Sequence, residues 1–340
     1  MKKGLLIFSI ILWTIIAIAI VGLIIFGLNG GFNHMINTGT LIKSENVSLS
    51  NIQNIVVDAS SQTVEIHKIS GNSIKISQYG STKTSNERLF LISASEDAVH
   101  IYFNSNHNFS LFDFNISEKL VIEIPEEFTG DLDAKASSGN VKIEDDFKLK
   151  NALLQSQSGN ISIVRNLTAG SLNAETSSGD INSHMNITVD EEVVLKCSSG
   201  NINLDGDLAA RDLNARTNSG RIRLGNVNVE KYSLQSSSGN IKAESISGGG
   251  EAEASSGDIQ LSLKNPKGNV KLTSNSGSIR IVLEPSLQFT LDAQTNSGGI
   301  HTNFATMSNG KNNKATAKIG DNPTVSIIAQ ASSGGIRIER

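Results

Sequence analysis

The chain is poor in cysteine, proline, aromatic residues and charge. It has one cysteine and four prolines in 340 residues, so it can form neither an internal disulfide nor a cysteine-rich zinc cluster. Aromatic residues make up 5% of the chain, charged residues 18%, and the formal net charge is −4. A charge this small for the length gives no strong basic field, so nucleic-acid binding is not indicated. Ser, Asn, Gly and Thr are correspondingly abundant, which favours a β-rich, turn-rich protein over a helical bundle.

The one long hydrophobic run lies near the N-terminus. Residues 5–28 are almost wholly apolar, and about 20 apolar residues suffice to span a bilayer core as a helix. A cleavable signal peptide has a shorter hydrophobic region of about 7–15 residues. We therefore expect an uncleaved, single-pass membrane anchor over residues 1–30. Lys2 and Lys3 precede the run, which predicts a cytoplasmic N-terminus by the positive-inside rule.

A Ser-Gly-x-Ile repeat fills most of the chain beyond that run. Representative copies are "TNSGRIRL" at 217–224 and "SSSGNIKA" at 236–243. Serine precedes the glycine in every copy, and successive glycines lie 18 to 21 residues apart, except for a final interval of 36. A degenerate first copy, "ASSQTVEI" at 59–66, has Gln62 in the glycine position. The repeat glycines are Gly139, Gly159, Gly179, Gly200, Gly220, Gly239, Gly257, Gly277, Gly298 and Gly334.

The residues around each glycine alternate between apolar and polar. Ile or Val lies two residues after the glycine, and Ala or Leu lies five residues before it. Because a period of two is typical of a half-buried strand, each copy predicts a strand, a Ser-Gly turn and a second strand. The glycine suits either a positive φ or a position that the next coil approaches closely. The Asn or Asp that often follows it also tolerates a positive φ.

One such unit cannot bury its apolar face alone, but stacked units bury a continuous column of side chains. We predict an all-β fold, a single-stack β-solenoid of about ten 20-residue coils. At about 4.8 Å per coil the stack forms a rod of roughly 50 Å. Residues 52–125 lack the Ser-Gly unit but keep the alternation, which predicts longer strands at the N-terminal end. Residues 303–326 lie within the 36-residue interval and are expected to cover the exposed end coil as a loop or to form an inserted hairpin.

Three domains are therefore expected: the anchor at 1–30, a polar stalk or linker at 31–50, and an extracytoplasmic domain at 51–340. Within the last, "VEIHKISGNSIKISQYG", "KLVIEIPEEFTGDLDAKASSGNVKIED" and the tandem Ser-Gly coils resemble the bacterial putative-adhesin β-solenoid family, a domain of unknown function. With its N-terminal anchor the chain also resembles LiaG-type membrane proteins of Gram-positive cell-envelope-stress operons. The resemblance implies the solenoid fold but no catalytic residues, because the family has no established activity.

Candidate chemistry is sparse. The histidines do not fall in a metal-ligand spacing, so we expect no metal, although three of them (His67, His100 and His107) belong to one region. The acidic runs at 125–127, 144–146 and 190–192 fall in or near connections and are typical of solvated surfaces. The aromatic residues concentrate in the N-terminal half, where "FSLFDF" at 109–114 favours strand core over a sugar-binding platform. The full sets are His34, His67, His100, His107, His184 and His301, and Phe103, Phe109, Phe112, Phe114 and Phe128.

The single cysteine invites a nucleophile hypothesis. Cys197 lies three residues before Gly200, and the other coils have Ala, Ser or Thr at that position. We therefore predict a small inward position, where a free cysteine behaves as a small hydrophobe. No catalytic residue and no cofactor is predicted.

The chain is expected to be a non-enzymatic structural, adhesive or binding module of the cell envelope. Its partners would be the membrane and either a cell-wall polymer or an envelope membrane protein, with no nucleic acid. Two alternatives stay open. One is an accessory that modulates envelope-stress signalling by protein contact, and the other is a polysaccharide-active enzyme, which would need clustered carboxylates in a groove.

Overall fold

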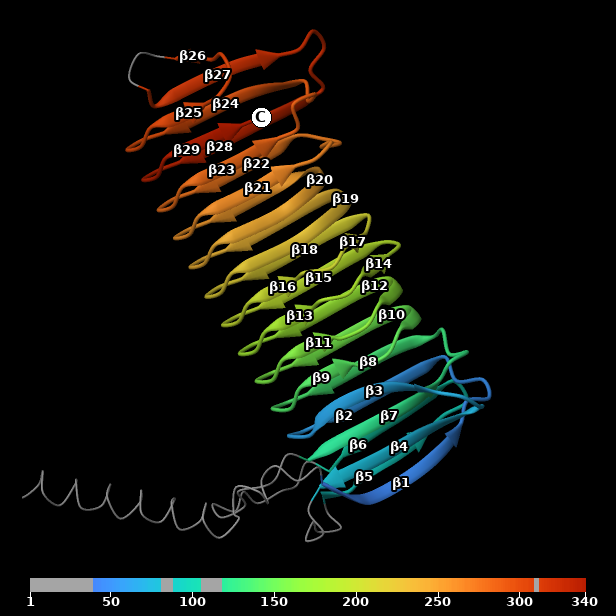
Figure 1. The fold of residues 1–340 in the computed structure, drawn as a ribbon. Coiled ribbons are helices and arrows are strands. Elements are labelled where there is room, and N and C mark those ends of the chain that lie inside the picture. The colour runs from blue at the N-terminus through green and yellow to red at the C-terminus, as the bar shows by residue number, and fades with distance from the viewer. Residues whose placement is uncertain (1–38, 81–87, 105–117, 309–311) are drawn as a thin grey trace, which may run out of the picture.

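In the computed structural model, residues 39–80, 88–104, 118–308 and 312–340 are described, and every element among them is a β-strand. The strands pair into one continuous sheet that winds into a rod (Figure 1). The predicted all-β solenoid is thus confirmed. In these ranges no helix is long and apolar enough to span a membrane, and the anchor predicted over residues 1–30 lies outside them.

The coils are three-sided, because the strand pairings form three parallel ladders. The first side holds the strands that run into the Ser-Gly turns, and these pair mainly in parallel with the same strand of the next coil. Its strands are β2 (Asn54–Ala59), β8 (Asp131–Ala136), β15 (Glu192–Cys197), β18 (Asp212–Thr217), β22 (Val270–Ser274), β24 (Phe289–Thr295) and β28 (Val325–Ala331), with the C-terminal parts of β10 (Phe147–Ser156), β12 (Leu167–Thr176), β19 (Ile222–Ser236) and β20 (Ile241–Ala254).

The second side holds the strands that leave the turns, and the third side closes the coil. The second side consists of β3 (Thr63–Ile69), β9 (Val141–Ile143), β11 (Ile161–Ile163), β13 (Ile181–Ser183), β16 (Ile202–Leu204), β21 (Ile259–Leu263), β23 (Ile279–Leu283), β25 (Ile300–Thr302) and β29 (Ile336–Glu339), with the N-terminal parts of β19 and β20. The third side consists of β14 (Ile187–Val189), β17 (Leu208–Ala209), the N-terminal parts of β10 and β12, and middle parts of β19 and β20.

The core is a set of columns of inward side chains. The isoleucine (valine at 141) two residues after each turn glycine stacks in register on its equivalent in the next coil, as Ile202 does on Ile222. Both are fully buried, and burying an isoleucine of this size contributes about 1.5–3 kcal/mol. The alternation of the sequence therefore becomes a continuous apolar interior, while every second residue of a strand faces outward.

The N-terminal end adds antiparallel strands to the solenoid. These strands are β1 (Thr40–Ser48), which pairs with β4 (Ser73–Gly80), and β5 (Phe90–Ala94), which pairs with β6 (Ala98–Phe103). β4 also pairs antiparallel with β7 (Lys119–Pro125). The first described strand, β1, therefore begins within the segment expected to be a stalk. The described residues between 52 and 125 form strands as predicted, but only part of these strands lies in parallel coils.

Chain order and stacking order differ at both ends of the rod. At the N-terminal end β2 lies between β6 and β8, so the coil of β6 and β7 is outermost although it follows β2 and β3 in the chain. At the C-terminal end β28 lies between β22 and β24, so the last coil of the sequence is inserted between two earlier ones. Figure 1 shows this as a dark red coil between two orange ones.

The long final interval forms an inserted hairpin, one of the two expected alternatives. β26 (Met307–Ser308) and β27 (Lys314–Ile319) pair antiparallel, and β27 pairs antiparallel with β24. The hairpin therefore also covers the outer edge of β24, which would otherwise present unpaired backbone groups at the end of the rod.

Candidate functional site

The ten repeat glycines stack on one another at one corner of the rod. A Cβ on any of them would come closer than 3.0 Å to the carbonyl oxygen of the residue stacked before it, which is Gln62 for Gly139 and the preceding stacked glycine for the rest. None of the ten has a positive φ; among the described glycines only Gly71, Gly248 and Gly320 do. Of the two reasons considered for glycine here, the close approach of the next coil is therefore the correct one.

Small hydroxyl side chains complete the turns from inside. At the position three before the glycine, Thr217 donates to the carbonyl of Gly200 at 2.8 Å, and Thr176 donates to the carbonyl of Gly159 at 2.9 Å. Ser156, Ser236, Ser274 and Thr295 make the equivalent bond. This satisfies a carbonyl at a corner of the buried backbone, and leaving such a group unpaired costs about 1–3 kcal/mol. The sequence indicates a small residue at this position but not this bond.

The Asn and Asp residues after the glycines form a ladder of their own. The side-chain oxygen of Asn140 accepts the backbone N–H of Asn160 at 2.8 Å, Asn160 accepts that of Asp180 at 2.8 Å, and Asp180 accepts that of Asn201 at 2.7 Å. The expectation that these residues serve a positive φ is wrong. Among the described residues other than glycine, a positive φ occurs at Asn51, Asn265 and Asn312, none of which follows a turn glycine.

Cys197 occupies the inward position that the sequence predicts. It is 5% exposed, and its sulfur lies 3.6 Å from the carbonyl oxygen of Asn201. Burial raises the pKa of the thiol to about 12, so the thiolate needed by a nucleophile is absent at neutral pH. The lone cysteine is part of the core.

The described histidines lie apart from one another on the rod, and one of them contacts an acidic run. On the second side His67 lies 3.5 Å from Asp145, whereas His100 is 2.7 Å from Asp58 on the first side. His184 contacts Asp205, and His301 lies on β25. His34 and His107 lie outside the described residues. In the described ranges no group of three His, Cys, Asp or Glu side chains could hold a metal ion.

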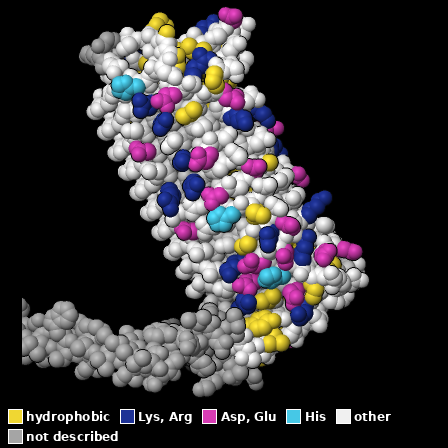
Figure 2. Space-filling view, viewed as in Figure 1, with side chains coloured by type: hydrophobic (Ala, Val, Ile, Leu, Met, Phe, Trp, Pro, Cys, Tyr) yellow, Lys and Arg dark blue, Asp and Glu magenta, His cyan; other side chains and the backbone are white. Residues whose placement is uncertain are grey.

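The second side is a surface of paired charges. Glu65 is 2.9 Å from Lys119 and 3.2 Å from Lys142. Burial alone would raise the pKa of Glu65, but the hydrogen bonds and charges of these two lysines outweigh it and lower that pKa. Further pairs along this side join Arg223 to Asp205 and Lys242 to Glu244. Figure 2 shows charges of both signs interspersed along the rod.

The residues just before the turn glycines differ from this surface because none of them is charged. Two columns of residues, one and two positions before each turn glycine and before Gln62, run along the rod, and we call them the serine edge. The column next to the glycine is serine in every coil, and its members are all exposed. In the other column every residue is Ser, Asn or Gln. The two columns are Ser61, Ser138, Ser158, Ser178, Ser199, Ser219, Ser238, Ser256, Ser276, Ser333 and Ser297, and Ser60, Ser137, Gln157, Ser177, Ser198, Asn218, Ser237, Ser255, Asn275, Ser332 and Asn296.

The backbone of the serine edge is satisfied, but its hydroxyls are available. The N–H of Ser199 donates to the carbonyl of Ser177 at 2.8 Å, and Ser219 bonds Ser198 in the same way at 3.0 Å. Within the described part of the chain, the side chains of the all-serine column make no hydrogen bond to protein. The edge therefore offers a row of free hydroxyls repeated once per coil, about 4.8 Å apart.

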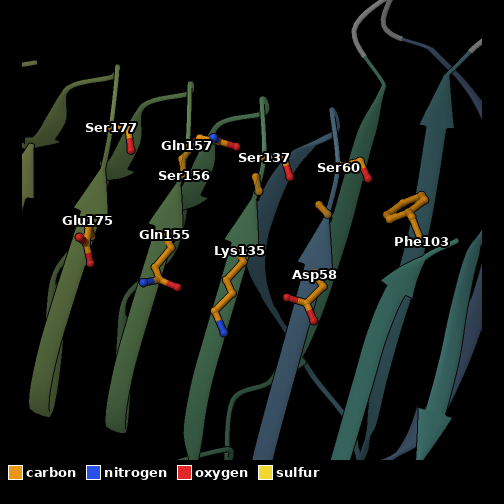
Figure 3. A pocket seen from close by; sticks show the side chains of 12 residues that line it. Asp58, Ser60, Phe103, Lys135, Ser137, Gln155, Ser156, Gln157, Glu175 and Ser177 are labelled. Carbon is orange, nitrogen blue, oxygen red and sulfur yellow. The ribbon is translucent and has the colours of Figure 1, made fainter. Parts of the chain in front are cut away.

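A trough of about 460 Å³ adjoins the serine edge near the N-terminal end. Figure 3 shows outward side chains of neighbouring coils side by side in it, with Phe103 at one end. One row consists of Asp58, Lys135, Gln155 and Glu175, which are paired in register. A second row consists of Ser60, Ser137, Gln157 and Ser177 from the serine edge. Phe103, at the end of β6, is half-buried, so its ring both packs on the core and faces the trough.

The carboxylates of the trough are too far apart for glycoside hydrolysis. Asp58 and Glu175 are separated by three coil steps, or roughly 14 Å. The two carboxyl groups of glycosidases lie about 5–9.5 Å apart. The trough therefore lacks the carboxylate pair of a glycoside hydrolase. Of the other aromatic residues, Phe128 is buried in the core, while Phe109, Phe112 and Phe114 lie outside the described residues.

Fold and surface together define a class: a three-sided parallel β-solenoid whose turn corner carries an uncharged polar edge. The Toastrack DUF4097 family matches residues 52–188 and 166–339, and the chain belongs to this family. The resemblance to the putative-adhesin β-solenoid family is thereby confirmed, and the family is one of unknown function. No curated protein is significantly similar to the chain.

Several solved structures are similar to the chain over most of its length. A putative adhesin from Parabacteroides distasonis is 12% identical, with 89% of this chain and 98% of that chain covered and a TM-score of 0.47. A putative adhesin from Parabacteroides merdae is 14% identical, with 89% and 97% covered and a TM-score of 0.46. A putative lipid binding protein from Parabacteroides distasonis is 13% identical, with 88% and 96% covered and a TM-score of 0.34. Matches at this level say nothing of what this chain binds.

Proposed function

We propose that the chain is a non-enzymatic binding module of the bacterial cell envelope that holds an extended polymer along its serine edge. The carrying observation is the edge itself, an uncharged row of exposed hydroxyls repeated in every Ser-Gly coil on a rigid scaffold. A rigid array loses little conformational entropy on binding, so many weak contacts of one kind can add up. The separation of the trough's carboxylates supports binding over catalysis.

The proposal includes a location. The apolar run at residues 5–28 holds the protein in the cell membrane as a single-pass anchor, with the N-terminus cytoplasmic and the solenoid outside. The partner is then a polymer of the cell wall. The alternative partner is a membrane protein of an envelope-stress system. The two partners are distinguished by whether the chain binds the cell wall through the serine edge or is cross-linked to membrane proteins without wall binding.

The test is co-sedimentation of the full chain, in detergent, with purified cell-wall sacculi. A triple variant Ser178→Ala, Ser199→Ala and Ser219→Ala removes three neighbouring hydroxyls from the edge. Since these side chains are exposed, its stability should stay within about 0.5 kcal/mol of the parent, while wall binding should fall severalfold. The matched control is Ser162→Ala, Thr188→Ala and Ser262→Ala, which removes three outward hydroxyls from the other sides. Equal binding by both triple variants, or cross-linking of the chain to membrane proteins without wall binding, would contradict the proposal.

A further inference from the structure

Three charged side chains, those of Asp58, Lys135 and Glu175, line the trough beside the serine edge. Asp58 is paired with His100 at 2.7 Å, and Lys135 is paired with Asp133 at 2.7 Å. The charges nearest Phe103 are thus directed to partners within the protein. What the trough offers a ligand in its middle is two amides, Gln155 and Gln157, and the hydroxyls of the serine edge.

An aromatic surface closes the N-terminal end of the same trough. Tyr102 is in register with Asp58, one coil step beyond it, and its ring lies 4.9 Å from that of His100. Phe103 follows Tyr102 and lines the trough directly, with its ring beside Ser60 and Asp58 (Figure 3). Ligand sites commonly combine such an apolar surface with a few polar groups that fix orientation, in volumes of about 300–1,000 Å³.

This combination matches the chemistry of a sugar ring. A pyranose has a face of C–H bonds that packs on an aromatic ring, and a rim of hydroxyl or acetamido groups that bonds amides and hydroxyls. The rows of the trough repeat about every 4.8 Å, and an extended β-linked glycan advances by a similar distance per residue. Successive sugars can therefore lie over equivalent positions on successive coils, from the end at Phe103 through Gln155 toward Glu175.

We propose that the trough is a subsite for a neutral, hydroxyl- and amide-bearing β-linked glycan, with one ring packed on Phe103 and a later ring bonded by Gln155 and Gln157, which lie on one coil. The inference rests on the proposed function, because it identifies the class of polymer that the serine edge holds. It also gives the bound chain a direction, since the aromatic surface is present only at the N-terminal end of the trough.

The experiment titrates the full chain in detergent with the β-1,4-linked tetramer of N-acetylglucosamine, by calorimetry. We expect saturable binding that Phe103→Leu weakens by at least about tenfold, because leucine keeps apolar contact with the core but lacks the ring face. Gln157→Ala, at an exposed position, tests the polar half of the trough without touching the core and should weaken binding severalfold. Gln330→Ala changes an exposed glutamine in the row of Gln155, at the other end of the rod, and should leave binding unchanged.

Absence of tetramer binding, or equal weakening by Gln157→Ala and Gln330→Ala, would overturn the subsite. Binding of poly(glycerol phosphate) in place of the tetramer would overturn it as well, because the partner would then be an anionic polymer. The wall-binding assay separates this failure from failure of the proposed function. If sacculi still bind through the serine edge while the tetramer does not bind, only the subsite falls; if neither binds, both fall.

Discussion

Coils in the middle of the rod stack in chain order, whereas coils at its two ends do not. Between β8 and β23 consecutive coils of the chain pair with one another, so neighbours in sequence are neighbours in space. At both ends a coil is inserted out of chain order and an antiparallel strand covers the outermost coil. The difference shows that the repeat itself does not determine where the stack ends. Each end of the rod is therefore covered by antiparallel strands that lack the repeat.

The largest effect is expected from removing the inserted C-terminal coil. Deletion of residues 325–340 removes β28 and β29, which pair with β22 and β23 on one side and with β24 and β25 on the other. Each buried side chain lost contributes about 1.5–3 kcal/mol. Hydrogen exchange should show loss of protection over residues 289–319 and retained protection over residues 141–263. Retained protection of β24 would show that the end stacks without the inserted coil. Removal of Arg340 alone is the control.

A smaller effect is expected from adding a methyl group at the turn corner, and it should be the same in the middle and at the end. Gly200→Ala and Gly334→Ala both push a Cβ onto the carbonyl oxygen of the coil before. Each should lower the free energy of unfolding by about 1–3 kcal/mol or more. Gly335→Ala is the matched control, because a Cβ added there would have the carbonyl oxygen of Gly299 as its nearest contact, at 3.4 Å. Equal losses for Gly334→Ala and Gly335→Ala in denaturant unfolding would contradict the close-approach explanation.

The inward hydroxyls predict a pair of opposite effects. Thr217→Val keeps the shape of the side chain but removes the donor to the carbonyl of Gly200, which should cost about 1–3 kcal/mol. Cys197→Thr places a hydroxyl where its neighbours Thr176 and Thr217 already have one, and should stabilise by about 0.5–1.5 kcal/mol. Thermal unfolding of both variants beside the parent measures the two shifts. A stabilised Thr217→Val would refute the role of the bond.

The smallest effect is expected at the cysteine itself. Cys197→Ala should leave the fold and wall binding unchanged, since coils with Ala136 or Ala254 have alanine at this position. The folded thiol has its pKa raised to about 12, and the contribution of the protonated thiol to stability is present below the unfolded pKa of about 8.5. That contribution is lost as the pH rises through the folded value. At pH 8 the native thiol should react with iodoacetamide far more slowly than in denaturant; equal rates would reopen the nucleophile hypothesis.

The sequence is informative about the middle of the rod and much less about its ends. The alternation around Gly200 and Ile202 predicts both strands, the turn and the inward residues, because burial on one face demands a period of two. Local pattern cannot reveal that β28 inserts between β22 and β24, since any Ser-Gly coil can pair with any other. The same equivalence hides the trough, which arises only where Phe103 of β6 meets the rows of β2 and β8. The side-chain hydrogen bonds of Thr217 and Asn160 join different coils, so they cannot be predicted from the sequence of a single repeat.

The inserted coil has a consequence for how the protein is made. A chain synthesised from its N-terminus can stack β8 through β23 as each coil emerges, because every new coil finds its neighbour already in place. The segment from β24 to β27 emerges next, yet the coil that joins it to the rod is encoded after it. Assembly of the far tip must therefore wait until β28 and β29 have been synthesised. A chain that stops before these strands would present the open edges of β22 and β23, which β28 and β29 otherwise cover.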